Sequence, residues 1–404
     1  MSVLGASQVV QAQTAPDSGT IDVPDGPQPQ IDDPISDAEL QDLKTIASQS
    51  GMSLQAAIDR YAWNDNFALA LASVREVSPQ AFAGAAIVDA DTAWVAFKEA
   101  TPQAAREIIA TFERSHVGVS VGVRTDVGFT ELELEKAIPT VHYAILGRPE
   151  VRDATTSFDF TTGQIRTKIG LEDTVTDTVP SDLRTIAEQS LIDATRTSIL
   201  DKIGISVIRS RVAVLGGTDS SSEHLGGEAI STCTSGFGTI NSNGTKGTST
   251  AGHCGNSQSD DGVSLTFKND YEGTHGDFQW HTGTQPNPDD FYAGSTSSTE
   301  VNRRDVVSIG SPAVGQSLCM NGKTTNAHCQ EVRQLGVCYN GSCNLVQMGE
   351  RQADSGDSGG PYYWGNTAYG LHKGWHYDPF APFDRDLFSR TDRIDDALGI
   401  FINS

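Results

Sequence analysis

Cysteine is missing from the first 232 residues of this 404-residue chain, and lysine and arginine are missing before Lys44. No run of about 20 apolar residues occurs, so no segment is predicted to span a membrane. Basic residues are scarce throughout, because 28 Lys and Arg stand against 52 Asp and Glu, a net charge of −24. Neither half of the chain is basic, which argues against nucleic acid or an anionic membrane as a partner.

All six cysteines lie between positions 233 and 343. An even set confined to one part of a chain is typical of a disulfide framework in an exported domain. Zinc is the alternative, but the sequence has no pair of cysteines with two residues between them. Local sequence predicts the pair Cys338–Cys343, because Asn340-Gly341 between them is a hairpin signal that would set the two directly opposite.

The glycine-rich string Gly356-Asp357-Ser358-Gly359-Gly360-Pro361 is the most informative stretch. A serine nucleophile needs a tight turn, and glycines on both sides permit it. The backbone N–H groups of Gly356 and Ser358 are then candidates to donate to a developing oxyanion. By itself such a string is also compatible with a surface loop.

Upstream, Thr250-Ala251-Gly252-His253-Cys254 offers a histidine beside a cysteine. A general base needs an imidazole within hydrogen-bond reach of the hydroxyl. A lone histidine is more often a buried structural residue, but the serine string downstream favours the catalytic interpretation.

The two strings, with candidate aspartates between them, resemble the chymotrypsin-like serine peptidases, which share the chain order His, Asp, Ser. The secreted bacterial streptogrisin and α-lytic protease group is the most similar branch, over about residues 226–404. The resemblance implies an all-β chymotrypsin-like double β-barrel of Greek-key type with a C-terminal helix. It also implies the disulfides Cys233–Cys254 and Cys319–Cys329, and a mechanism that acts on protein or peptide substrates and needs neither a metal nor an organic cofactor.

The third catalytic residue has to be a carboxylate between His253 and Ser358. Asp277, in Gly276-Asp277-Phe278-Gln279-Trp280, enters an apolar, strand-like run and is our prediction, with Asp270 as runner-up. His275 and His281 flank Asp277, but their spacing matches no usual metal-ligand pattern. The remaining candidates are Asp260, Asp261, Glu272, Asp289, Asp290, Glu300, Asp305, Glu331, Glu350, Asp354 and Asp357.

The string Gly370-Leu371-His372-Lys373-Gly374 resembles the strand that lines the specificity pocket in this family. His372, Lys373 and Gly374 are therefore predicted to bind substrate. A histidine and a lysine there would favour an acidic side chain, such as glutamate, before the cleaved bond. The alternatives are broad or apolar specificity, with Lys373 pointing to solvent. Lys323 stands where relatives commonly carry an arginine that pairs with the aspartate before the nucleophile.

The chain is predicted to have four parts: an export-related or disordered leader (1–35), an α+β pro-region (36–215), a linker with the activation cleavage (216–225) and the protease domain (226–404). The second part resembles the pro-regions of the same group, and its position ahead of a protease supports this. The resemblance implies an intramolecular chaperone and inhibitor. An unrelated accessory domain is the alternative. Cleavage is expected between about Arg211 and Gly226.

Within the α+β part, periodicity predicts a set of helices and strands. Ser36 with Glu39 forms a capping-box pattern at the start of the first helix. Helices are expected over 36–63, with a break at 51–53, and over 101–115 and 180–203. Strands are expected over 81–98 around a turn at 89–91, and over 117–123, 157–169 and 205–214, while residues 131–146 are predicted to be mixed.

Together these observations predict a secreted, extracellular serine endopeptidase made as a zymogen. The alternative from another class is a catalytically inactive binding protein on the same fold. An apparently intact triad of His253, Asp277 and Ser358 favours the enzyme.

Overall fold

The computed structural model describes residues 35–160, 162–171, 182–194, 197–209, 225–284, 288–294, 303–377 and 384–404. The chain divides into two compact units, 1–31 and 32–404, and every described residue lies in the second. The predicted leader and nearly all of the predicted linker fall outside the described residues. No described helix is long and apolar enough to cross a membrane.

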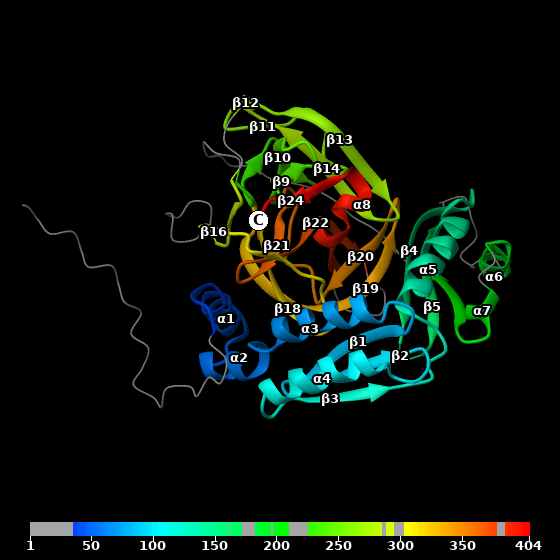
Figure 1. Ribbon diagram of the computed structural model, residues 1–404. Helices are drawn as coiled ribbons and strands as arrows, with labels where there is room; N and C mark the ends of the chain where they lie inside the picture. Colours follow the sequence, from blue (N-terminus) through cyan, green and yellow to red (C-terminus); the bar gives the residue numbers. More distant parts are fainter. Residues whose placement is uncertain are drawn as a thin grey trace, which may run out of the picture. The chain divides into compact units, whose positions relative to one another are not determined.

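Helices open the described chain (Figure 1). The predicted break is present, because Gly51 ends the first helix in the left-handed region (φ 65°) and Ser53 caps the second. The expected capping box is also present, with the Ser36 hydroxyl and the Glu39 carboxylate each accepting a backbone N–H of the other residue. The helices that begin the chain are α1 (Asp37–Ser50), α2 (Leu54–Tyr61) and α3 (Asn64–Val77).

The sequence did not predict α3, whose first residues Asn64 and Asp65 are poor helix formers. The helix buries Phe67, Leu71 and Val74, which pack on a three-stranded sheet. Tertiary packing therefore overrides propensity here. The sheet has the order β1-β2-β3 and is covered by the predicted helix α4 (Gln103–Ser115); its strands are β1 (Phe82–Asp89), β2 (Thr92–Phe97) and β3 (Ser120–Arg124).

Residues 131–146 were predicted to be mixed, and this prediction is wrong, because they form one helix, α5 (Glu131–Leu146), with Pro139 inside it. A capping box of Thr130 and Glu133 starts the helix, and its buried face stabilises it against a second sheet. The other elements of this layer are β4 (Val151–Asp159), β5 (Gln164–Leu171), α6 (Leu183–Asp193), α7 (Thr197–Leu200) and β6 (Gly204–Arg209).

From residue 225 onward the described chain is almost entirely β-structure. The strands of its first half form a smaller sheet of order β12-β11-β7-β8 and, together with the C-terminal strand β24, a sheet of order β13-β14-β10-β9-β24. Their strands are β7 (Ala229–Ile230), β8 (Cys233–Thr234), β9 (Gly238–Asn241), β10 (Lys246–Thr250), β11 (Ser259–Asp260), β12 (Val263–Ser264), β13 (Thr266–Gly273), β14 (Gly276–Thr282) and β24 (Ile400–Ile402).

The second half closes on itself. Its strands follow the order β18-β21-β22-β23-β20-β19, and a further pairing of β19 with β18 completes a ring. These strands are β18 (Ser317–Gly322), β19 (Asn326–Tyr339), β20 (Ser342–Met348), β21 (Pro361–Trp364), β22 (Thr367–Tyr377) and β23 (Asp384–Arg390). The short strand β17 (Ser308–Ile309) pairs in parallel with β22, and β15 (Asp290–Tyr292) pairs with β16 (Arg303–Asp305).

The expected C-terminal helix is short. A 3₁₀ turn, η2 (Thr391–Arg393), leads into α8 (Ile394–Leu398). Gly399 then ends the helix in the left-handed region (φ 66°), and β24 follows and pairs with β9.

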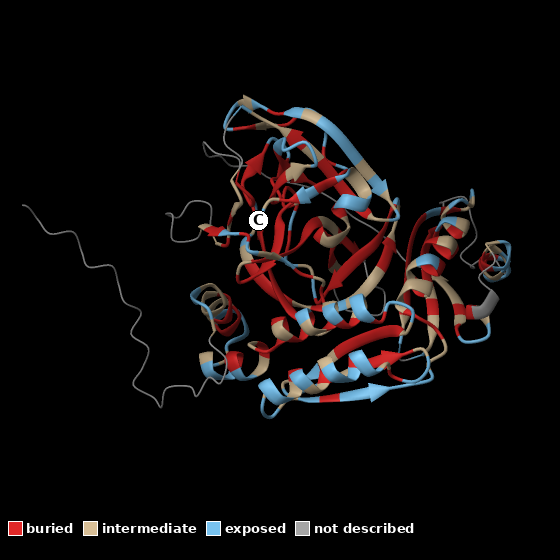
Figure 2. Cartoon of the chain, viewed as in Figure 1, coloured by how far each residue is buried: buried red, intermediate tan, exposed pale blue. Residues whose placement is uncertain are grey.

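Buried residues concentrate in the strands of the β-structure in Figure 2. One apolar cluster joins α1 and α2 to the closed ring, and includes Leu43, Ile58, Met320 and Trp364. Another joins α5 and β4 to the cystine of Cys338 and Cys343. The segment before residue 210 and the β-structure after residue 225 therefore share hydrophobic cores.

Candidate active site

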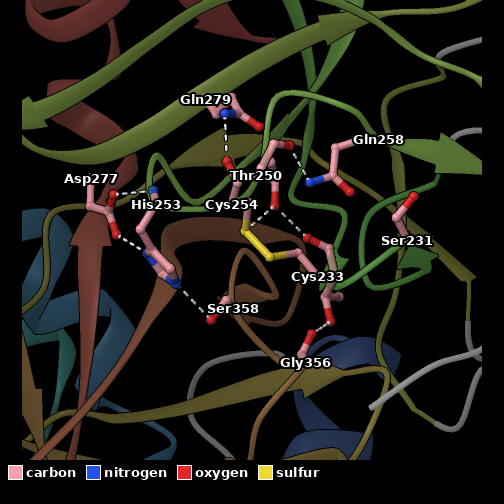
Figure 3. The surroundings of a disulfide bond; sticks show 12 residues. Ser231, Cys233, Thr250, His253, Cys254, Gln258, Asp277, Gln279, Gly356 and Ser358 are labelled. Carbon is pink, nitrogen blue, oxygen red and sulfur yellow. Dashed lines mark hydrogen bonds and ion pairs between the residues drawn. A yellow bond between two sulfur atoms is a disulfide. The ribbon is translucent and has the colours of Figure 1, made fainter. Parts of the chain in front are cut away.

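Three side chains from separate parts of the β-structure form one hydrogen-bonded chain (Figure 3). His253 lies in the turn after β10, Asp277 near the start of β14 and Ser358 in the turn before β21. The His253 Nδ1 lies 2.6 Å from Asp277 Oδ2, and its Nε2 lies 3.0 Å from Ser358 Oγ. A carboxylate only accepts, so Nδ1 carries the proton and Nε2 is free to accept the serine proton.

The pairing of β14 with β10 and β13 places the Asp277 carboxylate beside His253. Asp277 is completely buried, and its Oδ1 also accepts the His253 backbone N–H at 2.9 Å. Burial by itself would raise the pKa of Asp277, but the Lys373 ammonium and His253 outweigh burial and hold that pKa well below its usual range. The runner-up, Asp270, is exposed on β13. The structure thus brings Asp277, and not Asp270, to the imidazole.

The turn that carries His253 is held tightly. The disulfide Cys233–Cys254 anchors the residue after the histidine, and it lies beside the imidazole in Figure 3. A Cβ added to Gly252 would come within 2.6 Å of Asp277 Oδ1, so glycine is required for this close approach. The chain also contains the other two expected disulfides, Cys319–Cys329 and Cys338–Cys343.

The Ser358 turn depends on two glycines in the left-handed region, Gly356 (φ 100°) and Gly359 (φ 91°). The N–H groups of Asp357, Gly359 and Gly360 donate within the protein. In the described part of the chain, the N–H groups of Gly356 and Ser358 have no acceptor. They are the two donors that the sequence predicts for an oxyanion hole.

Asp357 is completely buried, yet its carboxylate does not use the Lys323 ammonium as its partner. Its oxygens accept the N–H of Thr324 at 2.7 Å, the Thr325 hydroxyl at 2.7 Å and the N–H of Asp354 at 2.8 Å. Lys323 instead donates to the Ser231 carbonyl at 3.0 Å, and burial lowers its pKa to about 8.

The three predicted substrate-binding residues separate in the structure. His372 is buried with Nδ1 3.4 Å from the Tyr362 hydroxyl, whereas the Lys373 ammonium donates to Asp277 at 2.9 Å. Lys373 therefore does not join His372 as the sequence predicted, because successive side chains along a strand such as β22 point to opposite faces. Gly374 has open space where a Cβ would lie.

Sequence reasoning missed Tyr362 and Ser389. The Tyr362 ring stacks on His372 (ring centroids 6.1 Å apart), and the Ser389 hydroxyl accepts the Asp277 backbone N–H at 2.9 Å. Neither residue lies in a recognisable string, so only the fold could reveal them. His281, considered as a metal ligand, hydrogen-bonds through Nε2 to Gln279 Oε1 at 2.6 Å.

Known proteins resemble part of this chain. Glutamyl endopeptidase 2 of Streptomyces griseus is 32% identical over 169 residues, which are 37% of this chain and 84% of the relative. Streptogrisin-C of the same organism is 34% identical over 140 residues, 32% of this chain, and the match spans only 29% of that relative. The solved structure of a Nocardiopsis protease is 21% identical, covers 45% of this chain and 100% of that chain, and has a TM-score of 0.39. No family model matches the sequence.

The relative that this chain matches over 84% of its length defines the class as serine endopeptidases. The chain belongs to the chymotrypsin-like serine peptidases. The resemblance predicted from the His253 and Ser358 strings is confirmed at the level of the family.

Proposed function

We propose that this chain is the zymogen of a secreted serine endopeptidase that cleaves peptide bonds through an acyl-enzyme. The observation that carries the proposal is the continuous path from Asp277 through His253 to Ser358 Oγ, at 2.6 and 3.0 Å. Three disulfides support an oxidising, extracellular compartment.

In the proposed reaction His253 accepts a proton and then donates it in each of the two steps, acylation and deacylation. Ser358 Oγ attacks the substrate carbonyl carbon while its proton passes to His253 Nε2, and the carbonyl oxygen becomes an oxyanion. The N–H groups of Gly356 and Ser358 donate to that oxyanion. His253 then gives the proton to the leaving amine, which breaks the peptide bond. Water, deprotonated by His253, hydrolyses the ester in the second half of the reaction.

A fluorophosphonate probe tests this function directly, because it reacts only with an activated serine. The secreted product should be labelled at Ser358, as shown by peptide mapping, and labelling should abolish cleavage of a peptide substrate. A secreted, folded protein that is neither labelled nor able to cleave peptides would instead indicate an inactive binding protein on this fold.

We further propose that the enzyme prefers glutamate before the cleaved bond. Burial, assisted by His328, keeps the pKa of His372 well below its usual range, so its ring is neutral. In the tautomer in which Nδ1 accepts from the Tyr362 hydroxyl, the ring proton is on Nε2. That nitrogen is buried and has no hydrogen-bond partner among the described residues. A buried N–H without a partner is costly, and a substrate carboxylate would supply the missing acceptor.

Paired peptides that differ only as Glu or Leu before the cleaved bond are expected to favour Glu in kcat/KM. The preference should fall at least tenfold in His372→Val, since that change removes the donor and keeps an apolar wall. His275→Val, outside the Tyr362–His372 cluster, is the matched control and should leave the ratio of the two kcat/KM values unchanged. Equal or better cleavage after Leu by the unaltered enzyme would point to broad or apolar specificity.

The segment before residue 210 is proposed to be an intramolecular chaperone and inhibitor. Its strand β4 extends the closed ring of the protease by pairing with β19, with Thr156 opposite Cys338 and Thr155 opposite Tyr339. Helix α5 contacts the turn between β19 and β20, because His142 Nε2 lies 2.7 Å from the Asn340 carbonyl oxygen. Burial lowers the pKa of His142 to about 4, so this contact uses a neutral imidazole.

A buried ion pair strengthens the proposed docking. Asp42 of α1 accepts both terminal nitrogens of Arg304 at 2.9 Å, and the two side chains are 2% and 5% exposed. The Asp42 Oδ2 also accepts the Gly365 N–H at 2.7 Å. Removing one partner of such a pair leaves a buried charge without compensation and costs about 3–5 kcal/mol.

Residues 36–215, added as a separate chain, are expected to speed refolding of residues 226–404 and to inhibit the active product. Folds dominated by non-local contacts cross high folding barriers, and a template strand lowers that barrier. The variant Asp42→Asn should weaken the inhibition constant at least tenfold, whereas Asp37→Asn, an exposed change of equal charge on the same helix, should not. Refolding that is equally fast alone, with no inhibition by the added chain, would indicate an accessory domain.

A further inference from the structure

The carboxylate of Asp277 has a second cationic neighbour besides His253. The Lys373 ammonium donates to Asp277 Oδ2 at 2.9 Å, and this is the same oxygen that lies 2.6 Å from His253 Nδ1. The Lys373 side chain is only 9% exposed and that of Asp277 is not exposed at all. An ammonium and an imidazole therefore share one buried carboxylate oxygen.

Two features of the sheets explain why the Lys373 ammonium lies beside Asp277. Lys373 lies at the register shift of β22 between His372 and Gly374, and its ammonium reaches Asp277 on β14. Glu272 on β13 pairs directly with Asp277 on β14, so the two carboxylates lie on one side of the sheet. The ammonium lies between them, 3.5 Å from Glu272 Oε2.

Sharing the oxygen changes the balance between the neutral and the charged imidazole. A lone buried carboxylate strongly favours the imidazolium, whereas an ammonium on the same oxygen repels that positive charge and competes for the acceptor. The other titratable groups around this cluster have weaker effects. Glu272 is 42% exposed and screened by solvent. Burial holds the pKa of His372 well below its usual range, so that ring is uncharged.

We propose that Lys373 is a positioning residue of the active site, which fixes the Asp277 carboxylate and keeps His253 in its neutral, proton-accepting form at lower pH than Asp277 alone would allow. This inference rests on the proposed function, and it concerns how the proposed general base is controlled. Among the described residues the ammonium contacts the carboxylates of Asp277 and Glu272, and no hydrogen bond joins it to Ser358. It acts only through Asp277.

The test is the pH profile of kcat/KM for the active enzyme released from the full chain. In Lys373→Met the stem keeps its packing and the charge is lost, so the acid limb should move to higher pH by about 0.5–1 unit. Lys373→Arg keeps the charge and should leave the limb near its original position. Lys268→Met removes an equal charge from an exposed site on β13 and should not move the limb.

A second variant gives the opposite sign and remains informative if Lys373→Met does not fold. Glu272→Gln removes a negative charge and leaves the ammonium in place, so the acid limb should move to lower pH, by about 0.2–0.5 unit because Glu272 is partly exposed. The proposal is overturned if the acid limb of Glu272→Gln does not move. It is also overturned if Lys373→Met lowers the melting temperature but leaves the acid limb where it was. An unaltered enzyme that cleaves no peptide overturns the proposed function instead.

Discussion

Replacing Ser358 by alanine is expected to reduce kcat/KM by roughly 10⁴–10⁶ while the protein still folds. Only the hydroxyl group is lost. Its oxygen lies 3.0 Å from His253 Nε2 and is the atom that is proposed to attack the substrate. His253→Ala should cost a similar factor, since without the base the hydroxyl is a weak nucleophile. The measurement is single-turnover and steady-state hydrolysis of one peptide by each purified variant.

The double variant Ser358→Ala with His253→Ala should lose little more than either single variant, because the two groups act as one unit. Additive losses would mean that they act independently, contrary to the proposed mechanism. Ser355→Ala is the matched control, since it removes a hydroxyl from the same turn. Its Oγ has no hydrogen-bond partner among the described residues, and activity should remain within about threefold of the original.

Asp277→Asn is expected to reduce kcat by about 10⁴. The amide nitrogen donates, so the imidazole is driven toward the tautomer in which Nδ1 accepts and Nε2 carries the proton. Nε2 can then no longer accept from Ser358. The change also removes the buried counter-charge of the Lys373 ammonium, 2.9 Å from Oδ2. We therefore expect a lower melting temperature in addition to the loss of rate, which is not expected of Ser358→Ala.

Asp270→Asn provides the control for charge and position, because Asp270 is exposed on the strand that pairs with β14. Its activity should stay within about twofold of the original enzyme. Near-normal activity of Asp277→Asn together with a large loss in Asp270→Asn would transfer the proposed role to the runner-up.

The sequence predicted best where neighbouring residues carry the signal. The helices α1 and α2 follow from a capping box, an apolar period and a glycine break, and all three features lie within a few residues of one another. The pair Cys338–Cys343 follows from a turn of two residues. The strings around His253 and Ser358 were recognisable because the turns that present them need glycine at fixed places.

Prediction failed where packing outweighs local preference. Residues 131–146 contain a proline, yet they form one helix because a capping box starts it and its apolar face is buried against β4. Helix α3 begins with poor helix formers and exists because Phe67 and Leu71 fill a core. In both cases the stabilising contacts come from residues far away in the chain.

For this protein, the sequence by itself determined the family, the strings that carry the candidate base and nucleophile, and one cystine pair, while the resemblance to the family implied the other two. The choice among the acidic residues between those strings was decided by tertiary structure, since only the register of β13, β14 and β10 places Asp277 against His253. The position of Lys373 was decided in the same way. Lys373 directly follows His372 in β22, and its ammonium lies at the Asp277 carboxylate instead of the expected specificity pocket, because successive side chains along a strand point to opposite faces.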